Sequence, residues 1–172
     1  ITSNLIGAYN FTNICAGVLI GDFFDIPLND IKQAIEEYLP TNNRSQLITK
    51  GSTQIILDAY NANPTSMMAA LQHFNTIKTA SKMVFLGDMF ELGETAQEEH
   101  QDIVDYLSNS NIDEVHLIGS YFSKTKFQAK NIYQYTSFEA LKKAFKNNIT
   151  KDETILIKAS RGMALERILP LL

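Results

Sequence analysis

Apolar and polar positions along the chain follow two spacings. Residues 10–24 and 28–39 place apolar side chains three or four positions apart, which predicts two helices. Residues 45–58 instead alternate apolar and polar side chains around the Gly-Ser pair 51–52, a pattern typical of a hairpin that leads into a longer strand. The turn-rich residues 40–44 separate the two patterns and are the expected domain boundary.

Beyond this hairpin, short β-branched runs alternate with helical spacings. The expected strands are 54–58, 82–88, 114–119, 132–135 and 154–160. The expected helices are 65–78, 94–109, 120–128, 137–148 and 162–171. This alternation predicts right-handed βαβ crossovers, and therefore an α/β fold whose mostly parallel sheet carries helices on both faces. Residues 45–50 would add an antiparallel edge, and residues 1–39 a short helical appendage.

Composition and charge narrow the class of protein. The 172 residues are 45% hydrophobic and 20% charged, which suits one globular domain or a domain that carries a piece of another. The net charge is -4 and the Lys and Arg residues are scattered, so we expect no nucleic-acid surface. The single cysteine, Cys15, excludes an internal disulfide framework and indicates a reducing, cytoplasmic setting.

The amino-terminal residues and the apolar runs carry no targeting signal. No apolar run reaches the roughly 20 residues that a membrane span requires, so we expect no membrane span. The first residues lack the basic start and apolar middle of a signal peptide. They begin in mid-pattern without a methionine, as expected of a chain cut from a longer one.

Polar side chains gather in three of the strand-to-helix loops. Because ligands of parallel sheets bind beyond the carboxyl ends of the strands, these loops hold the candidate site. The first loop, DAYNANP, begins at Asp58; the second, GDMFELGETAQEEH, contains Asp88, Glu91 and His100; the third, KASRG, contains Arg161. We expect Asp58 and Arg161 to converge on one edge of the sheet.

Ordinary structural roles compete with function at several of these positions. Asp58 could cap a helix or close an Asx turn. Asn63 followed by Pro64 fits a helix cap with proline in the first turn. His100 follows two glutamates in an expected helix, where a histidine is more often solvated or hydrogen-bonded than catalytic. No His or Cys pair has the spacing of metal ligands, so we expect no metal site in this chain.

The usual phosphate-binding loops do not occur in this sequence. It contains neither GxGxxG nor GxxxxGK followed by Ser or Thr. We therefore expect this chain to hold only part of any nucleotide that it binds.

Five stretches together resemble one enzyme family. They are GAYNFTN, NNRSQ, LDAYNANPTSM, FLGDMFELGETAQEEH and IKASRGMALERIL. They resemble the carboxyl-terminal part of the Mur ligases, from about Gly7 to the end of the chain. DAYNANPTSM together with GDMFELG is similar to the member that adds D-alanyl-D-alanine to UDP-N-acetylmuramoyl-tripeptide in peptidoglycan synthesis.

This resemblance implies a cytoplasmic enzyme of three domains. An amino-terminal domain would hold the UDP sugar, and a central ATPase domain would carry the phosphate loop and the residues that bind Mg²⁺. Residues 1–39 resemble the tail of the central domain, and residues 40–172 resemble the Rossmann-like carboxyl-terminal domain that closes over the site. The other two domains, the tripeptide and D-alanyl-D-alanine would then be the partners of this chain.

The resemblance also implies residues that bind ATP. Asn10 and Asn13 match the pair that helps to hold the adenine side, Arg44 matches an arginine at the phosphates, and Asp58 matches an aspartate at the ribose hydroxyls. Guanidinium suits phosphate oxygens, and a carboxylate can accept from both hydroxyls. The full set that we expect at ATP is Asn10, Asn13, Arg44, Asp58, Tyr60, Asn61 and Asn63.

A second set is implied for the incoming dipeptide. Lys158, Ser160 and Arg161 match a KGSR loop near the acceptor, where a cation could hold a carboxylate. Two residues depart from the family pattern: Tyr9 stands where histidine is common, and Ala159 stands where KGSR has glycine.

The implied reaction is formation of an amide bond. ATP would phosphorylate the tripeptide carboxylate, and the amine of D-alanyl-D-alanine would attack the acyl phosphate. This chain would act as a lid, with no catalytic residue of its own and no turnover alone. A non-enzymatic nucleotide- or protein-binding α/β module is the alternative, and a family member with another acceptor amino acid is a further one.

Overall fold

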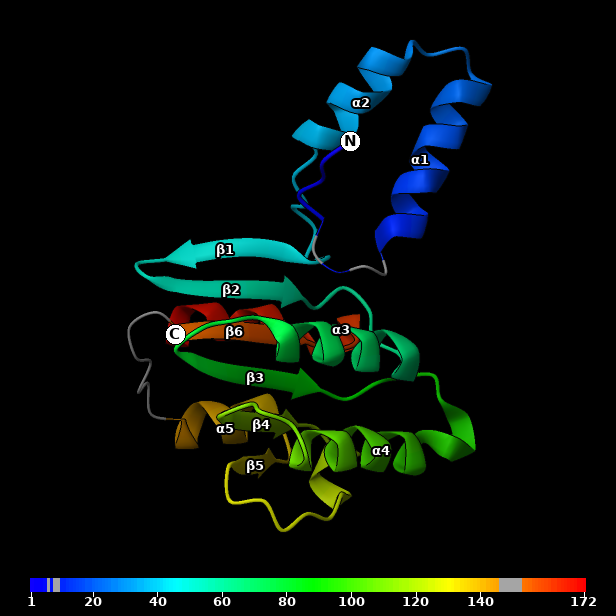
Figure 1. The fold of residues 1–172 in the computed structure, drawn as a ribbon. Helices are drawn as coiled ribbons and strands as arrows, with labels where there is room; N and C mark the ends of the chain where they lie inside the picture. The colour runs from blue at the N-terminus through cyan, green and yellow to red at the C-terminus, as the bar shows by residue number, and fades with distance from the viewer. Residues whose placement is uncertain (6, 8–9, 146–152) are drawn as a thin grey trace.

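A six-stranded sheet forms the centre of the structure, a computed structural model that describes residues 1–5, 7, 10–145 and 153–172 (Figure 1). The strands lie in the order β1 (Gln46–Lys50), β2 (Thr53–Asp58), β6 (Glu153–Lys158), β3 (Ser81–Gly87), β4 (Glu114–Ile118) and β5 (Ile132–Tyr135). β1 pairs antiparallel with β2, and the other neighbouring strands pair in parallel. This confirms the predicted α/β class, including its antiparallel edge.

Helices cover both faces of the sheet because its central strands are apolar on both. All six residues of β6 are buried, as expected for a strand inside a parallel sheet. Successive side chains alternate, so Leu156 packs in the core beneath α3 (Pro64–Thr76) and α4 (Ala96–Ser108). Ile155 packs in the opposite core, beneath α5 (Phe138–Ala144).

The predicted helix over 120–128 is wrong. This segment forms only a 3-10 turn, Phe122–Lys124. An α-helix would use the Phe122 carbonyl to accept an amide one turn later. That carbonyl instead accepts from the Thr125 amide at 3.1 Å, which is a 3-10 bond, and also from the Thr125 hydroxyl at 2.7 Å and the Gln134 side-chain amide at 2.8 Å. A 3-10 bond and two side-chain donors therefore take the place of the α-helical hydrogen bond here.

The predicted carboxyl-terminal helix over 162–171 is not an α-helix either. The segment forms two 3-10 turns, Arg161–Met163 and Leu165–Leu171. Ala164 between them has a left-handed φ of 46°, and Pro170 lacks an N–H to donate, so a continuous α-helix cannot form. The helix expected over 137–148 is α5, capped by the Ser137 hydroxyl, and its last expected residues lie outside the described ones.

The two helices predicted near the amino terminus are α1 (Phe11–Phe23) and α2 (Leu28–Glu37), here called the helical pair. The pair projects from the sheet beside β1 (Figure 1). Ile31 is its one buried apolar side chain among the described residues. Large apolar side chains remain exposed on or beside the pair: Phe11, Leu19, Ile20, Phe23, Phe24, Ile26, Leu28, Tyr38 and Leu39. In the described part of the chain, no helix has the length and apolar character to cross a membrane.

Candidate functional site

A cavity of about 290 Å³ brings together segments that are far apart in the sequence. The start of α1, the linker before β1, the loop after β2, the first turn of α3 and the end of β6 all contribute to it. Its lining residues are Asn10, Asn13, Arg44, Ser45, Asp58, Tyr60, Asn61, Asn63, Ser66 and Lys158. All seven residues predicted at ATP are among them, although their role there stays a prediction.

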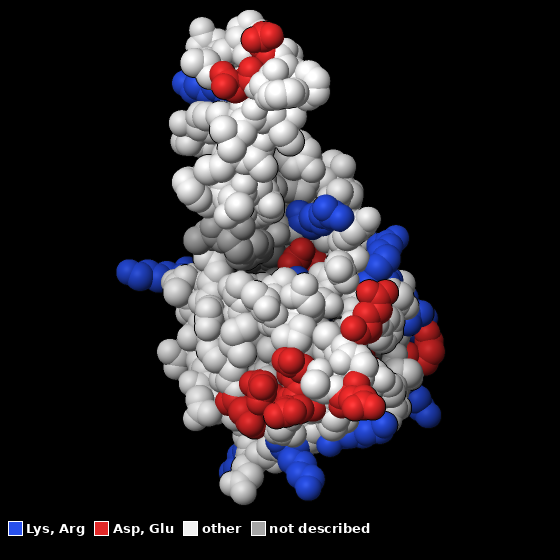
Figure 2. Space-filling view, turned by 90° about the vertical axis from the view of Figure 1, so that its right-hand side faces the viewer, with Lys and Arg blue, Asp and Glu red and all other residues white. Residues whose placement is uncertain are grey.

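The cavity lies at the carboxyl edge of the parallel strands. Asp58 and Lys158 are the last residues of β2 and β6, so their side chains reach the edge at which such sheets bind ligands. Figure 2 faces this edge and shows the surface hollowed between the helical pair above and the sheet below, with acidic and basic side chains around the hollow.

The loop after β2 owes its shape to the start of α3. The Asn63 side chain accepts from the Ser66 amide at 2.8 Å, and the Ser66 hydroxyl accepts from the Asn63 amide at 3.1 Å. This reciprocal capping box, followed by Pro64, begins the helix. The Asn61 side chain accepts from the Ala62 amide at 2.9 Å. Asn63 therefore has the structural role that the sequence left open, while still lining the cavity.

Asp58 is not the helix cap. Its Oδ2 accepts from Lys158 Nζ at 2.6 Å, and its Oδ1 accepts from the Ser45 amide at 3.2 Å. Lys158 is 2% exposed and also donates to the Asn61 carbonyl at 3.3 Å. The carboxylate and the ammonium form an ion pair at the edge of the cavity, and this pair ties the loop after β2 to β6 and to the linker before β1.

Arg44 supplies an accessible positive charge to the cavity. Its guanidinium carbon lies 3.8 Å from the centre of the Tyr60 ring, a stacking that steers the planar group without using its N–H donors. Among the described residues, no acceptor is bonded to this guanidinium. Asn13 Nδ2 donates to Asn10 Oδ1 at 3.0 Å, which links the two asparagines at the start of α1. Tyr9, beside them, lies outside the described residues.

The three residues predicted at the acceptor dipeptide lie in three different environments. Lys158 lines the cavity with Asp58. Ser160 is buried, where its hydroxyl accepts from the Phe90 amide at 2.9 Å and donates to the Ala62 carbonyl at 3.3 Å. Arg161 is exposed, is not among the residues that line the cavity, and pairs with Glu166 at 2.8 Å.

Ala159 fits the carboxyl edge because glycine faces it. A Cβ on Gly87 would lie 2.7 Å from the Ala159 methyl group, closer than carbon atoms can approach. The alanine in the KASRG loop is therefore matched by a glycine at the end of β3, and Ala159 is fully buried. The methyl group of Ala159 therefore fits against the sheet without displacing the KASRG loop.

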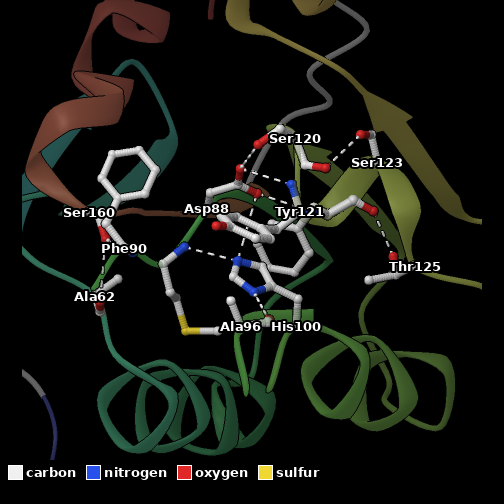
Figure 3. A network of polar contacts seen from close by, with 12 residues as sticks. Ala62, Asp88, Phe90, Ala96, His100, Ser120, Tyr121, Ser123, Thr125 and Ser160 are labelled. Atoms are coloured by element: carbon white, nitrogen blue, oxygen red, sulfur yellow. Dashed lines mark hydrogen bonds and ion pairs between the residues drawn. The ribbon is translucent and has the colours of Figure 1, made fainter. Parts of the chain in front are cut away.

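Asp88 and His100 belong to a buried network that fixes neighbouring loops (Figure 3). The Asp88 carboxylate accepts from the Tyr121 and Phe122 amides, each at 3.0 Å, and so caps the turn after β4. His100 Nδ1 donates to the Ala96 carbonyl at 2.5 Å, which leaves Nε2 to accept from the Met89 amide at 3.0 Å. Both partners suit a neutral ring, and burial lowers the pKa of His100.

A second histidine network was missed by the sequence reasoning. His116 on β4 is buried, with its Nε2 2.8 Å from Glu114 Oε1 and its Nδ1 3.1 Å from the Tyr135 hydroxyl. The ring stacks on Phe85 with 4.6 Å between ring centres. Burial lowers the pKa of His116 to about 4 and raises the pKa of Glu114. A histidine in an apolar strand was the only signal in the sequence.

Comparisons with known proteins agree on one family. The family model described as "Mur ligase, glutamate ligase domain" matches residues 43–161. The UDP-N-acetylmuramoyl-tripeptide–D-alanyl-D-alanine ligase of Bacillus subtilis (strain 168) is 36% identical over 172 residues, which cover 95% of this chain and 38% of the ligase. The ligase of the same name from Treponema pallidum (strain Nichols) is 34% identical, over 96% of this chain and 37% of that protein.

Solved structures show the same likeness. A crystal structure of MurF from Acinetobacter baumannii has a TM-score of 0.87 at 26% identity, and covers 99% of this chain and 39% of that one. MurF from Thermotoga maritima in complex with ADP shares the fold, with a TM-score of 0.79 at 22% identity over 97% of this chain and 38% of that one. This chain thus spans little more than a third of the length of the curated relatives named above.

Proposed function

Because this chain belongs to the Mur ligase family, we propose that it is the carboxyl-terminal part of an ATP-dependent ligase that adds D-alanyl-D-alanine to UDP-N-acetylmuramoyl-tripeptide. Curated relatives of that name match over nearly the whole chain, which supports this member of the family. The observation that carries the proposal is the cavity, which gathers the seven residues expected at ATP from three separate segments.

The chemistry of the cavity suits the adenosine and phosphate parts of ATP. Arg44 presents a guanidinium whose N–H donors bond to no acceptor among the described residues, which suits phosphate oxygens. Asp58 presents a fixed carboxylate, which suits the ribose hydroxyls. The amides of Asn10 and Asn13 offer both donors and acceptors to adenine. These residues bind and orient the nucleotide, while ATP supplies the phosphoryl group that activates the tripeptide carboxylate.

We assign no Mg²⁺ ligand to this chain. Among the described residues that line the cavity, Asp58 is the one with a carboxylate, and Lys158 already pairs with it. The described residues contain no group of three His, Cys, Asp or Glu side chains that could hold a metal ion. In the proposed enzyme, the ATP phosphates and the central domain would hold Mg²⁺, as the family resemblance implies.

The same proposal covers the acceptor and the other domains. Arg161 is exposed, so its guanidinium can exchange Glu166 for the carboxylate of D-alanyl-D-alanine. The central domain covers the exposed apolar side chains of the helical pair, which forms its tail. Closure of this lid brings Arg44 and Asp58 to ATP and the loop of Arg161 to the tripeptide acyl phosphate, and catalysis comes from positioning and charge neutralisation. The cytoplasmic location stays a prediction.

The test is a coupled assay of ADP release by the full-length protein, with each substrate omitted in turn. We expect release to require ATP, the tripeptide and D-alanyl-D-alanine together. Arg44→Ala should lower kcat/KM for ATP about ten- to a hundredfold, as for loss of a charge-assisted hydrogen bond of about 1.5–3 kcal/mol. Lys142→Ala, on the exposed side of α5, is the matched control and should change little.

The non-enzymatic alternative predicts another result. A binding module would hold a nucleotide without dipeptide-dependent release of ADP. Release that depends on a different amino acid, and not on D-alanyl-D-alanine, would instead assign the chain to another member of the family.

A further inference from the structure

We propose that Lys158 is a positioning residue for the nucleotide, because it holds the Asp58 carboxylate in the orientation that accepts the ribose hydroxyls. This inference rests on the proposed function and deepens it. It gives Lys158 a role different from the dipeptide contact expected from the sequence. Three observations support it: the register of β2 and β6, the burial of the Lys158 ammonium group, and the acceptor sites that remain on the Asp58 carboxylate.

The sheet itself places Lys158 beside Asp58. β2 and β6 are parallel neighbours, and Asp58 and Lys158 are partners in their register. Partners in a parallel pair lie at the same level of the sheet, so the two side chains emerge together at its carboxyl edge. The contact of 2.6 Å between Nζ and Oδ2 follows from this register.

The ammonium group of Lys158 is buried against the end of β2 and the loop after it. The Lys158 side chain is 2% exposed, and the Asp58 side chain is 14% exposed. Nζ donates to the carboxylate of Asp58, the last residue of β2, and to the carbonyl of Asn61 in the loop that follows it. Arg161, the exposed cation of the KASRG loop, is engaged with Glu166 instead. Lys158 and Arg161 therefore pair with different carboxylates, those of Asp58 and Glu166.

The remaining acceptor sites on Asp58 match a ribose. A carboxylate has about four acceptor sites, two on each oxygen. Lys158 occupies one on Oδ2, and the Ser45 amide occupies one on Oδ1. One site on each oxygen remains, and the carboxylate cannot rotate without breaking a hydrogen bond. A pair of fixed acceptors on adjacent oxygens suits the two neighbouring hydroxyls of a ribose.

A purely structural ion pair would behave differently. Pairs of this kind do not in general stabilise a fold beyond what apolar residues would, so burial alone does not explain the lysine. A structural role would affect the use of every nucleotide equally. A positioning role acts through the hydroxyls, so it disappears when the nucleotide lacks them.

The experiment compares two nucleotides in the full-length enzyme. We would measure kcat/KM for ATP and for 2′,3′-dideoxy-ATP, with the tripeptide and dipeptide saturating, in the wild type and in Lys158→Met. We expect the wild type to prefer ATP at least tenfold. Lys158→Met should lower kcat/KM for ATP at least tenfold and for the dideoxy analogue less than threefold, with KM for D-alanyl-D-alanine unchanged.

A second buried lysine gives the matched control. Lys82 at the start of β3 is 9% exposed, and its Nζ donates to the Asn75 carbonyl at 2.6 Å, away from the cavity. Lys82→Met should lower the use of both nucleotides by the same factor, if at all. If Lys158→Met does not fold, the double variant Asp58→Asn/Lys158→Met buries no unpaired charge and should lose the preference for ATP in the same way.

Each other outcome overturns a separate statement. An equal loss with both nucleotides reduces Lys158 to a structural role. A rise in KM for D-alanyl-D-alanine alone returns Lys158 to the acceptor. A wild type that uses both nucleotides equally well removes the ribose contact and the inference with it. A wild type without ATP-dependent ligation overturns the proposed function instead.

Discussion

Asp58 and Asn63 lie five positions apart, at the end of β2 and just before α3, and their side chains have different structural roles. Asn63 caps α3, while Asp58 pairs with Lys158 and the Ser45 amide. The sequence could name both as candidates because Asp and Asn are common at caps and turns. It could not separate them, since the partner of Asp58 comes from a strand 100 residues later. Long-range pairing of this kind has no local signature.

His116 makes the stability of the fold depend on pH. Burial lowers its pKa from 6.5 to about 4. Between these values the unfolded chain binds a proton that the folded protein does not, so the free energy of unfolding falls as the pH decreases from 6.5 to 4. The largest contribution is about 3 kcal/mol. We expect His116→Gln to flatten this part of the profile, measured by urea denaturation across the pH range.

Glu114 should change the stability with pH in the direction opposite to His116, so it serves as a control. Burial raises its pKa above the ordinary value of 4.5, so the folded protein keeps a proton that the unfolded chain has already lost, and stability falls as the pH rises above 4.5. Glu114→Gln should therefore steepen the profile that His116→Gln flattens. Parallel profiles for the wild type and His116→Gln would show that His116 does not carry the effect.

Regular elements were predictable where the pattern of apolar residues decides them. The five β-branched runs formed β2 to β6, as expected for the strands of a mostly parallel sheet, and the alternating run before them formed the partly exposed edge strand β1. The segments 120–128 and 162–171 failed because side-chain hydrogen bonds and a left-handed residue override helical spacing there. The loops of the candidate site were also predictable, because they follow the carboxyl ends of strands. The burial of Ser160 and the pairing of Lys158 were not, because they depend on how distant segments pack.

A substitution at Gly119 would test the hydrogen bonds by which the Asp88 carboxylate caps the turn after β4. Gly119 has a φ of 132°, and a Cβ there would lie 2.2 Å from Asp88 Cγ. Gly119→Ala would strain the backbone and displace the carboxylate that caps the turn, so we expect a loss of about 3 kcal/mol or more in the free energy of unfolding. Chemical denaturation of this chain followed by circular dichroism would measure it.

Gly17 is the matched control for that substitution. It lies in α1, where a Cβ would meet no atom within 4 Å. Gly17→Ala should leave the unfolding of the sheet unchanged and raise helix stability by up to about 1 kcal/mol. A similar small effect of Gly119→Ala would mean that Asp88 can move without cost, and that this network does not fix the loops.

At the scale of the whole molecule, the cavity depends on the helical pair and the sheet together. Asn10 is the N-cap residue of the first helix of the pair and Asn13 lies within it, whereas Asp58 and Lys158 come from the sheet. The exposed apolar side chains of the pair indicate that it needs a further surface to cover it. In the proposed enzyme that surface is the central domain, which also supplies the phosphate loop that this sequence lacks.

This division of the nucleotide site predicts weak binding by the chain alone. In the proposed enzyme, Arg44, Asp58 and the two asparagines would contact only one part of ATP, and the sequence of this chain contains no phosphate loop to hold the triphosphate. By calorimetry we expect ATP to bind this chain with a dissociation constant of about 1 mM or weaker, near -4 kcal/mol. The full-length protein should bind at least tenfold more tightly, and Arg44→Ala should remove most of the residual affinity. A low-micromolar constant for the isolated chain, about -8 kcal/mol, would place a complete phosphate site within these residues and contradict the division proposed here.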